Sequence, residues 1–212
     1  MKVVELVDVA KHYGAVRALD GVSASFESGT LTHVAGPNGA GKSTLLRVIA
    51  GLTRQTRGRV NVLDVDLFRS LHARERGRVG YLGPEAGLYG ELTLTENLRF
   101  CARLHGVSES RIDAVLQRLD LGQVRARPVS TLSLGFRRRA GLSRLLVTDC
   151  ELWLLDEPWN GLDADASASL AGELRAHRES GRTALVAAHV VGDYAALFDR
   201  GVVLHGGRLA DA

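Results

Sequence analysis

The sequence has no stretch of the about 18–20 consecutive apolar residues that a membrane-spanning helix needs. Its N-terminus also lacks a basic segment followed by an apolar one, so we expect neither a membrane span nor a signal peptide. The longest mostly apolar segments, Leu152–Leu155 and Ala184–Val191, are short enough to be buried strands. Two cysteines, Cys101 and Cys150, form no CxxC pair, and the seven histidines show no metal-ligand spacing. These absences argue against a disulfide framework or a structural metal site and favour a cytosolic environment.

Lysine is scarce as well, since only three of the basic residues are lysine, among them Lys42. The formal net charge is +3, and arginines gather at residues 54–59, 74–78 and 137–139. We interpret these clusters as solvated surface and expect no nucleic-acid partner, with contact to phosphates or an anionic membrane as the alternative. Hydrophobic residues make up 45% and charged residues 24%, which is ordinary for a globular chain.

Short β-branched segments alternate with longer helical patterns, which predicts a mostly parallel sheet flanked by helices. The expected strands are Val3–Val7, Leu31–Ala35, Arg59–Leu63, Arg78–Leu82, Glu151–Asp156, Thr183–Ala188 and Gly201–Leu204. The expected helices are Lys42–Ala50, Thr95–Leu104, Ser108–Leu119, Ser133–Thr148 and Ala164–Glu179. The stretch from about Glu85 to Val129 is helical in pattern with no strong strand, which predicts a small helical subdomain inserted into an α/β core.

One segment, Gly-Pro-Asn-Gly-Ala-Gly-Lys-Ser-Thr, matches GxxxxGK[ST] between an expected strand and an expected helix. Its glycines let the backbone curl so that N–H groups converge on phosphates, and the start of the helix adds its positive dipole end. Lys42 supplies a charge to the terminal phosphates, Ser43 a hydroxyl for Mg²⁺ and Thr44 a further hydrogen bond. The predicted contacts of Mg²⁺ and the nucleotide, ATP in our interpretation, are Gly36, Pro37, Asn38, Gly39, Ala40, Gly41, Lys42, Ser43 and Thr44. Taken alone, a phosphate loop leaves kinases, GTPases and ATPases open, and the features below narrow the choice.

The strand Glu151–Asp156 is apolar in its middle and leads directly into a second carboxylate, Glu157. Asp156, at the strand's end, would hold Mg²⁺ through water, and Glu157 would polarise the attacking water as a general base. Beside a phosphate-binding loop, this pair predicts nucleotide hydrolysis.

Five further residues are candidates for the same site. Ser133 and Gly135 belong to a Leu-Ser-Leu-Gly-Phe segment at the start of an expected helix, where a γ-phosphate could bind, although a serine helix cap is the alternative. His189 follows an expected strand and would hold the attacking water. Asp163 would shape the site across a subunit interface. Tyr13 would stack on adenine, unless it is only a core or surface aromatic.

Along the chain these features follow one another as the aromatic residue, the phosphate loop, the LSLG helix, the Asp-Glu-Pro strand, the Asn-Gly-Leu-Asp turn and the histidine. In this order of features, the sequence resembles the ATP-binding cassette (ABC) ATPases over nearly its whole length. The resemblance implies a P-loop NTPase fold with a mostly parallel core sheet, an antiparallel β portion and an inserted helical subdomain. The implied boundaries are 1–84 and 150–212 for a RecA-like core and 85–149 for the helical subdomain. It also implies a head-to-tail dimer that holds ATP between Lys42 of one copy and Ser133 of the other, so a single copy should bind ATP but hydrolyse it poorly.

The chain departs from the family pattern after the strand Arg78–Leu82, where the family usually has a glutamine. No glutamine occurs there, and its place falls on Pro84 or Glu85. Proline can neither donate a hydrogen bond nor bind Mg²⁺. We therefore hypothesise that Glu85 is a metal ligand.

Because the chain resembles one cassette only, it is similar to a separate ATPase subunit that drives an integral-membrane permease. Such a subunit would be peripheral at the inner face of the cell membrane. A short permease helix would dock in a groove bordered by Pro84–Glu91. Segments 81–100 and 152–158 are similar to the haem-exporter-type ATP-binding subunits of cytochrome c maturation. The alternatives are a multidrug- or lipid-type export ATPase, a soluble ABC ATPase acting on DNA or ribosomes, and a P-loop kinase.

Overall fold

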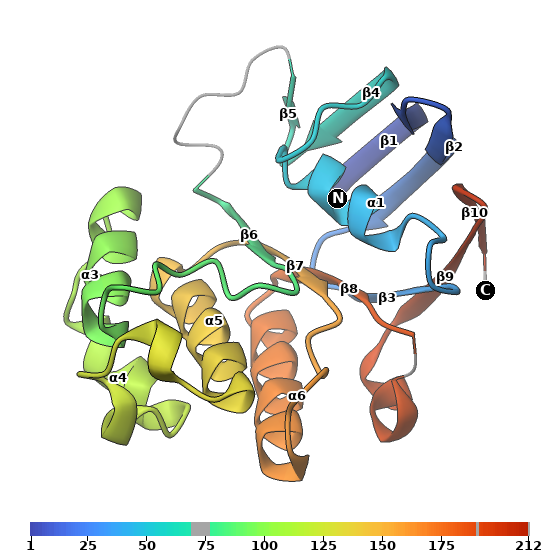
Figure 1. Cartoon of the computed structure of the whole chain (residues 1–212). Helices are drawn as coiled ribbons and strands as arrows, with labels where there is room; N and C mark the ends of the chain where they lie inside the picture. Colours follow the sequence, from blue (N-terminus) through green and yellow to red (C-terminus); the bar gives the residue numbers. More distant parts are fainter. Residues whose placement is uncertain (69–76, 190, 212) are drawn as a thin grey trace.

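The computed structural model describes residues 1–68, 77–189 and 191–211 (Figure 1). Its strands are β1 (Lys2–Tyr13), β2 (Val16–Glu27), β3 (Leu31–Ala35), β4 (Arg57–Val62), β5 (Val65–Asp66), β6 (Val79–Leu82), β7 (Leu152–Asp156), β8 (Thr183–Ala187), β9 (Arg200–His205) and β10 (Arg208–Asp211). Its α-helices are α1 (Lys42–Ile49), α3 (Leu94–His105), α4 (Arg111–Arg118), α5 (Leu134–Thr148) and α6 (Ala164–Glu179). Short 3₁₀ helices are η1 (Gly122–Val124), η2 (Val129–Thr131) and η3 (Gly192–Leu197).

The strands form two sheets. A four-stranded sheet has the order β2-β1-β4-β5 with antiparallel neighbours, and a six-stranded sheet has the order β10-β9-β3-β8-β7-β6. Within the larger sheet only β10 pairs antiparallel, with β9, among the described residues. The predicted class is confirmed: a mostly parallel core sheet with an antiparallel β portion.

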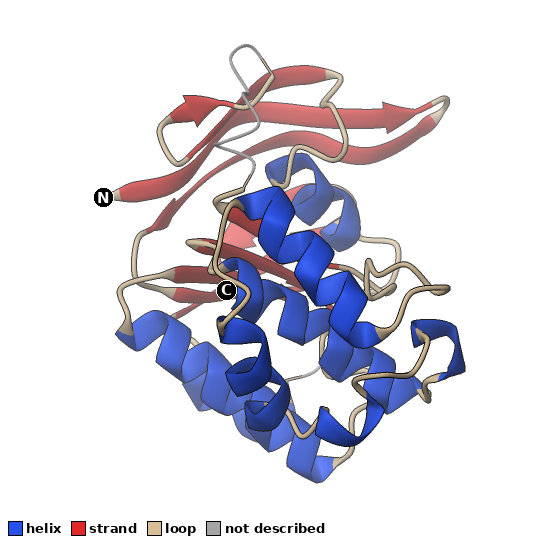
Figure 2. Ribbon diagram, turned by 90° about the vertical axis from the view of Figure 1, so that its left-hand side faces the viewer, coloured by secondary structure: helices blue, strands red, loops and turns tan. Residues whose placement is uncertain are grey.

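Alternate residues of the central strands pack on opposite faces of the larger sheet, as the pleat of a strand requires. Leu152 and Leu154 of β7 join a buried cluster with α1 and the antiparallel sheet. Trp153 and Leu155 join a second cluster with helices α3 to α6. Figure 2 shows the result, with the antiparallel sheet on one side and most of the helices on the other. Because α1 is packed between the two sheets, the loop that precedes it is fixed from both sides.

The helices α3, α4 and α5 follow β6 and precede β7 in the chain. The first of them begins with a capping box, in which Thr93 and Glu96 bond each other's backbone N–H groups. One buried cluster joins these helices to the larger sheet, so the core does not separate at residues 84 and 150, and the division into subdomains stays a prediction. In the part of the chain that the structure describes, no helix is long and apolar enough to cross a membrane.

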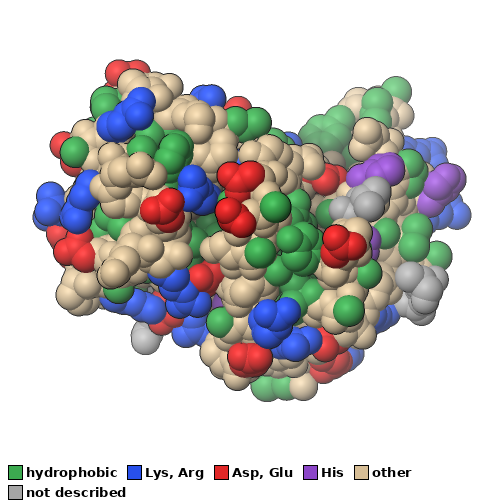
Figure 3. Space-filling model, turned by 90° about the horizontal axis from the view of Figure 1, so that it is seen from below, with side chains coloured by type: hydrophobic (Ala, Val, Ile, Leu, Met, Phe, Trp, Pro, Cys, Tyr) green, Lys and Arg blue, Asp and Glu red, His purple; other side chains and the backbone are tan. Residues whose placement is uncertain are grey.

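The expected strands and helices are all present, β3 and α6 with the predicted ends and the others with shifted ends. Strands β2, β5 and β10 were not expected. The β2 sequence carries Gly21 and no clean alternation, and it forms a strand because it pairs with β1 along its whole length. Helix α4 starts at Arg111 instead of Ser108, because the hydroxyls of Ser108 and Ser110 bond each other in a turn before it. Of the arginine cluster at 74–78, residues 74–76 lie outside the described residues. On the face seen in Figure 3, side chains of both charges are interspersed.

Candidate nucleotide-binding and catalytic site

The segment 36–44 forms a tight loop that only glycine can build at two of its positions. Gly36 has φ 145° and Gly41 has φ 105°, both in the region that side chains disfavour. A Cβ at Gly36 would lie 2.2 Å from the carbonyl oxygen of Leu204, and one at Gly41 would lie 2.3 Å from that of Ala18. The loop backbone therefore runs directly against β9 and β2.

The loop leads into the start of α1, where the first backbone N–H groups have no partner within the helix. The cap residue of α1, Gly41, offers no side-chain acceptor to the first N–H groups of the helix, and its first turn carries no acidic residue. The ammonium of Lys42, only 7% exposed, donates to the carbonyl oxygens of Gly36 (2.8 Å) and Pro37 (3.2 Å). Free N–H groups, a helix dipole and a buried cation fit an anionic ligand such as a phosphate chain.

Asp156 ends β7 at the same edge of the sheet, because β3, β8 and β7 are parallel. Its side chain is 1% exposed, and Oδ2 accepts a hydrogen bond from the Tyr81 hydroxyl at 3.3 Å. Its other oxygen, Oδ1, is buried and has no hydrogen-bond partner among the described residues. A buried carboxylate oxygen without a partner is unfavourable unless a cation or water meets it. This donor fits Mg²⁺, which prefers oxygen ligands.

Glu157 has φ 50°, which is unusual for a residue with a side chain and indicates a functionally constrained position. Its N–H donates to the carbonyl of Ala187 at the end of β8 (2.8 Å). Its Oε1 lies 3.9 Å from Lys42 Nζ, and its Oε2 accepts from the N–H of His189 at 3.4 Å. The structure thus brings together Lys42, Asp156, Glu157 and His189, the last with its side chain exposed.

Three predicted residues lie apart from this cluster. Ser133 caps α5, its hydroxyl accepting from the N–H of Phe136 (3.4 Å), and Gly135 follows in the first turn. Asp163 caps α6, its Oδ1 accepting from the N–H of Ala166 (2.8 Å). Within the described ranges, no hydrogen bond or ion pair joins these residues to the phosphate loop. Both polar caps are exposed, so a second molecule can reach them.

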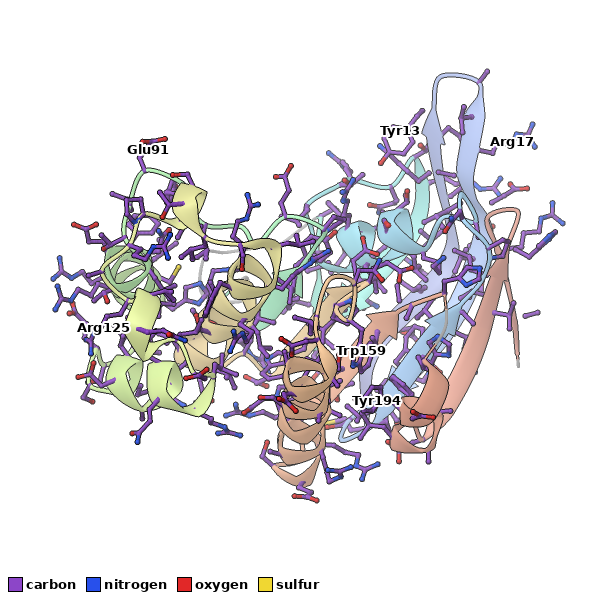
Figure 4. All side chains as sticks on the ribbon, turned by 60° about the horizontal axis from the view of Figure 1, so that its bottom comes forward. Tyr13, Arg17, Glu91, Arg125, Trp159 and Tyr194 are labelled. Carbon is purple, nitrogen blue, oxygen red and sulfur yellow. The ribbon has the colours of Figure 1, made fainter. Side chains whose placement is uncertain are left out.

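Tyr13 lies at the end of β1, near the turn of the β1–β2 hairpin (Figure 4). Its ring is 47% exposed, with the Lys11 ammonium 4.7 Å from the ring centre. An exposed ring of this kind has a face available for stacking, and its adenine contact stays a prediction.

Glu85 belongs to residues 83–87, which follow β6; we call them the hinge segment because they lie at the predicted boundary between the core and the helical subdomain. It is exposed and lines a hollow of about 560 Å³ together with Arg47 and Tyr81. Among the described residues it makes no hydrogen bond or ion pair. Its role as a metal ligand stays a prediction.

Three residues that contact the site were not anticipated from the sequence. Tyr81 bonds Asp156, Arg47 bonds Tyr81, and the buried Arg138 donates from Nη1 to the carbonyl of Gly83 in the hinge segment (2.8 Å). Burial lowers the pKa of Arg138. The one available signal was the phenol of Tyr81 in an otherwise apolar strand, because a buried tyrosine hydroxyl needs a partner.

An aromatic stack supports the loop after β7. The ring of Trp159 stacks on that of Tyr194 in η3, with centroids 5.5 Å apart and planes 14° from parallel (Figure 4). This contact ties the segment between Glu157 and Asp163 to the segment that follows His189.

A glycine-rich loop between β3 and α1, facing two carboxylates at the end of a parallel strand, defines a nucleotide-binding ATPase of the P-loop class. The chain belongs to the ABC transporter family, whose model matches residues 19–160, and is an ATPase subunit of that family. It is 39% identical to the cytochrome c biogenesis ATP-binding export protein CcmA of Paracoccus denitrificans, over 90% of this chain and 84% of the relative. It is 38% identical to the daunorubicin resistance ATP-binding protein DrrA3 of Streptomyces coeruleorubidus, over 94% of this chain and 64% of that one.

Solved structures agree with this assignment. The ATP-binding subunit of an ABC transporter superposes with a TM-score of 0.90 at 27% identity, over 99% of this chain and 90% of that one. A dimeric cassette, MJ0796, in a post-hydrolysis state with ADP and Pi, gives a TM-score of 0.90 at 23% identity, over 98% of both chains, which shows the shared fold.

Proposed function

We propose that this chain hydrolyses Mg²⁺·ATP in the site around Lys42 and so drives a separate membrane permease. The observation that supports it most is the convergence of the phosphate loop with Asp156, Glu157 and His189 at one edge of the sheet. In this proposal Lys42 and the N–H groups of the loop bind the phosphates. Ser43 and Asp156 would hold Mg²⁺, which when bound would supply positive charge next to the phosphates.

Glu157 is the proposed general base. Its carboxylate takes a proton from the attacking water, while His189 and the helix start keep that water and the γ-phosphate in line. The backbone bond from His189 to Oε2 fixes the direction of the carboxylate before the substrate binds. A prepositioned base lowers the reorganisation needed in the transition state.

A second copy would complete the site. Ser133, at the start of α5, and Asp163, at the start of α6, are exposed, Gly135 is half-buried, and all three lie outside the cluster around Lys42. In a head-to-tail dimer, Ser133 of one copy would meet the γ-phosphate on Lys42 of the other, since a helix start is a good anion site.

The partner surface is an apolar groove of about 670 Å³ beside the hinge segment. Tyr89, Phe100, Leu104 and Leu134 line it, and each is more than two-fifths exposed. Exposed apolar side chains gathered in one groove favour a protein partner, and we propose a short amphipathic helix of the permease. Docking there would hold the chain at the inner face of the cell membrane.

The permease that we propose belongs to cytochrome c biogenesis, with haem-linked export as the sequence resemblance implies. In support, relatives from Paracoccus, Ruegeria and Rhodobacter with that name are 38–39% identical and extend over 84–90% of this chain. The drug-resistance relative is almost as similar, so a drug-export permease is the second candidate.

Recovery of the partner tests the proposal. Tagged Glu157→Gln, which should keep ATP bound, is purified from native membranes with ATP beside a matched Glu157→Gln/Leu104→Glu variant. We expect a membrane protein to accompany the first and not the second, and its identity to distinguish the two permeases. Recovery of no membrane protein by Glu157→Gln with ATP bound would contradict the permease proposal.

A further inference from the structure

A chain of hydrogen bonds joins α1 to the end of β7. Tyr81, on β6, places its hydroxyl 3.3 Å from Oδ2 of Asp156 and 3.3 Å from Nε of Arg47, in the last turn of α1. Tyr81 is 34 residues from Arg47 and 75 from Asp156 in sequence. The fold therefore brings three separate elements to one hydroxyl group.

The direction of the two bonds follows from the chemistry of the groups. A guanidinium nitrogen only donates, so the Tyr81 oxygen accepts from Arg47 and must donate its single hydrogen to Asp156.

Because of this bond, the two oxygens of Asp156 have different surroundings. Oδ2 is engaged by Tyr81, whereas Oδ1 is buried without a partner among the described residues. Holding one oxygen fixes the rotation of the carboxylate, and hence the direction of the other. Partners of this kind orient metal ligands and tune metal affinity.

Tyr81 is itself held by the hinge segment and α5. Arg144 of α5 donates from Nη2 to the backbone carbonyl of Tyr81 at 2.6 Å. A Cβ at Gly83 would lie 2.8 Å from Cε1 and 2.9 Å from the hydroxyl of Tyr81, so the hinge backbone lies directly on the ring. The position of the hinge segment thereby fixes the position of the hydroxyl.

We propose that Tyr81 is a positioning residue that orients Asp156 toward the metal ion of the bound nucleotide and couples it to the hinge segment. This inference rests on the proposed function, because it assumes that Asp156 holds a metal ion there. Tyr81 would act through Asp156 and touch neither metal nor nucleotide.

The test compares Tyr81→Phe with the native chain, using Mn²⁺ as the metal probe and a non-hydrolysable ATP analogue. Electron paramagnetic resonance measures Mn²⁺ binding, and a fluorescent analogue measures nucleotide binding without metal. We expect the Mn²⁺ dissociation constant to rise about tenfold, with metal-free nucleotide affinity unchanged. Arg47→Met should act in the same direction, and the double variant should be no weaker than Tyr81→Phe, because the groups form one chain.

Tyr194→Phe is the matched control. It removes a phenol hydroxyl that takes no part in the hydrogen bonds between Arg47, Tyr81 and Asp156, and it should bind Mn²⁺ like the native protein. Unchanged Mn²⁺ affinity in Tyr81→Phe, or an equal loss of metal-free nucleotide binding, overturns the proposal. If Tyr81→Phe does not fold, the Mn²⁺ affinity of Arg47→Met is measured instead, because Arg47 is exposed. Unchanged Mn²⁺ affinity in Arg47→Met would then overturn the proposal. A native chain that binds no nucleotide would instead refute the proposed function.

Discussion

The ammonium of Lys42, at the start of α1, lies 3.9 Å from Oε1 of Glu157, just beyond the end of β7. Both side chains are largely buried, so this charge pair is poorly screened. The group proposed to bind the phosphates and the group proposed to accept the proton are therefore neighbours before any ligand arrives.

Glu157→Gln should keep nucleotide binding and lose hydrolysis. The amide has nearly the same shape but cannot accept the proton, so kcat should fall by about 10²–10⁴-fold. Phosphate release and analogue binding measure the two effects, with Glu179→Gln, an exposed glutamate at the end of α6, as the control. Hydrolysis at the native rate in Glu157→Gln would assign the base elsewhere.

Gly36→Ala should abolish nucleotide binding. Its Cβ would overlap the carbonyl oxygen of Leu204 at 2.2 Å, and φ 145° is unfavourable for alanine, so the loop must change shape. The matched control is Gly172→Ala in α6, where a Cβ meets nothing within 4 Å. That change should raise the free energy of unfolding by about 0.5–1 kcal/mol. Binding of an ATP analogue measures the nucleotide affinity, and chemical denaturation measures the free energy of unfolding. A Gly36→Ala protein with native nucleotide affinity would be inconsistent with a phosphate-binding role of the loop.

Mixing two inactive variants should restore activity. Lys42→Ala and Ser133→Ala each damage every site of a homodimer, but a mixed dimer retains one site with Lys42 from one copy and Ser133 from the other. Phosphate release from the mixture should therefore exceed that of either variant alone. A mixture as inactive as its components, with dimers present by light scattering, would rule out the head-to-tail arrangement.

Stability should fall in mild acid because of His177. The ring is 5% exposed, stacks on Trp153 with centroids 3.9 Å apart, and bonds the carbonyl of Thr183 at 3.1 Å. Burial lowers its pKa from 6.5 to about 4. Between these values the unfolded chain binds more protons than the folded one. The free energy of unfolding should therefore fall as pH drops from 6.5 to 4, by on the order of 3 kcal/mol.

Denaturation at several pH values in that window measures the effect. Buried Glu173 acts in the opposite sense, since burial raises its pKa, so the comparison must be made between variants. His177→Phe keeps the stack and should flatten the pH dependence, whereas the exposed His205→Gln should retain it. Equal slopes in the two variants would exclude His177 as the cause.

The sequence predicted those parts of the fold and site that depend on local pattern. The phosphate loop, β7 with its two carboxylates and α6 all carry their signal within a short segment. Strand β2 does not, because its pairing with β1 supplies what its own composition lacks. The bond between Tyr81 and Asp156 could not be predicted from the sequence either. It depends on β6 lying beside β7, and the order of elements along the chain does not dictate that pairing.

Helix α5 makes contacts at both ends and in its middle. Ser133 caps its start, Arg138 and Arg144 hold the carbonyls of Gly83 and Tyr81, and Asp149 at its end is paired with arginines. Its 15 residues span roughly 22 Å as one stiff rod. The exposed serine at its start, the segment after β6 and the arginine pairs at its end are therefore attached to one continuous element, so their relative positions depend on a single helix.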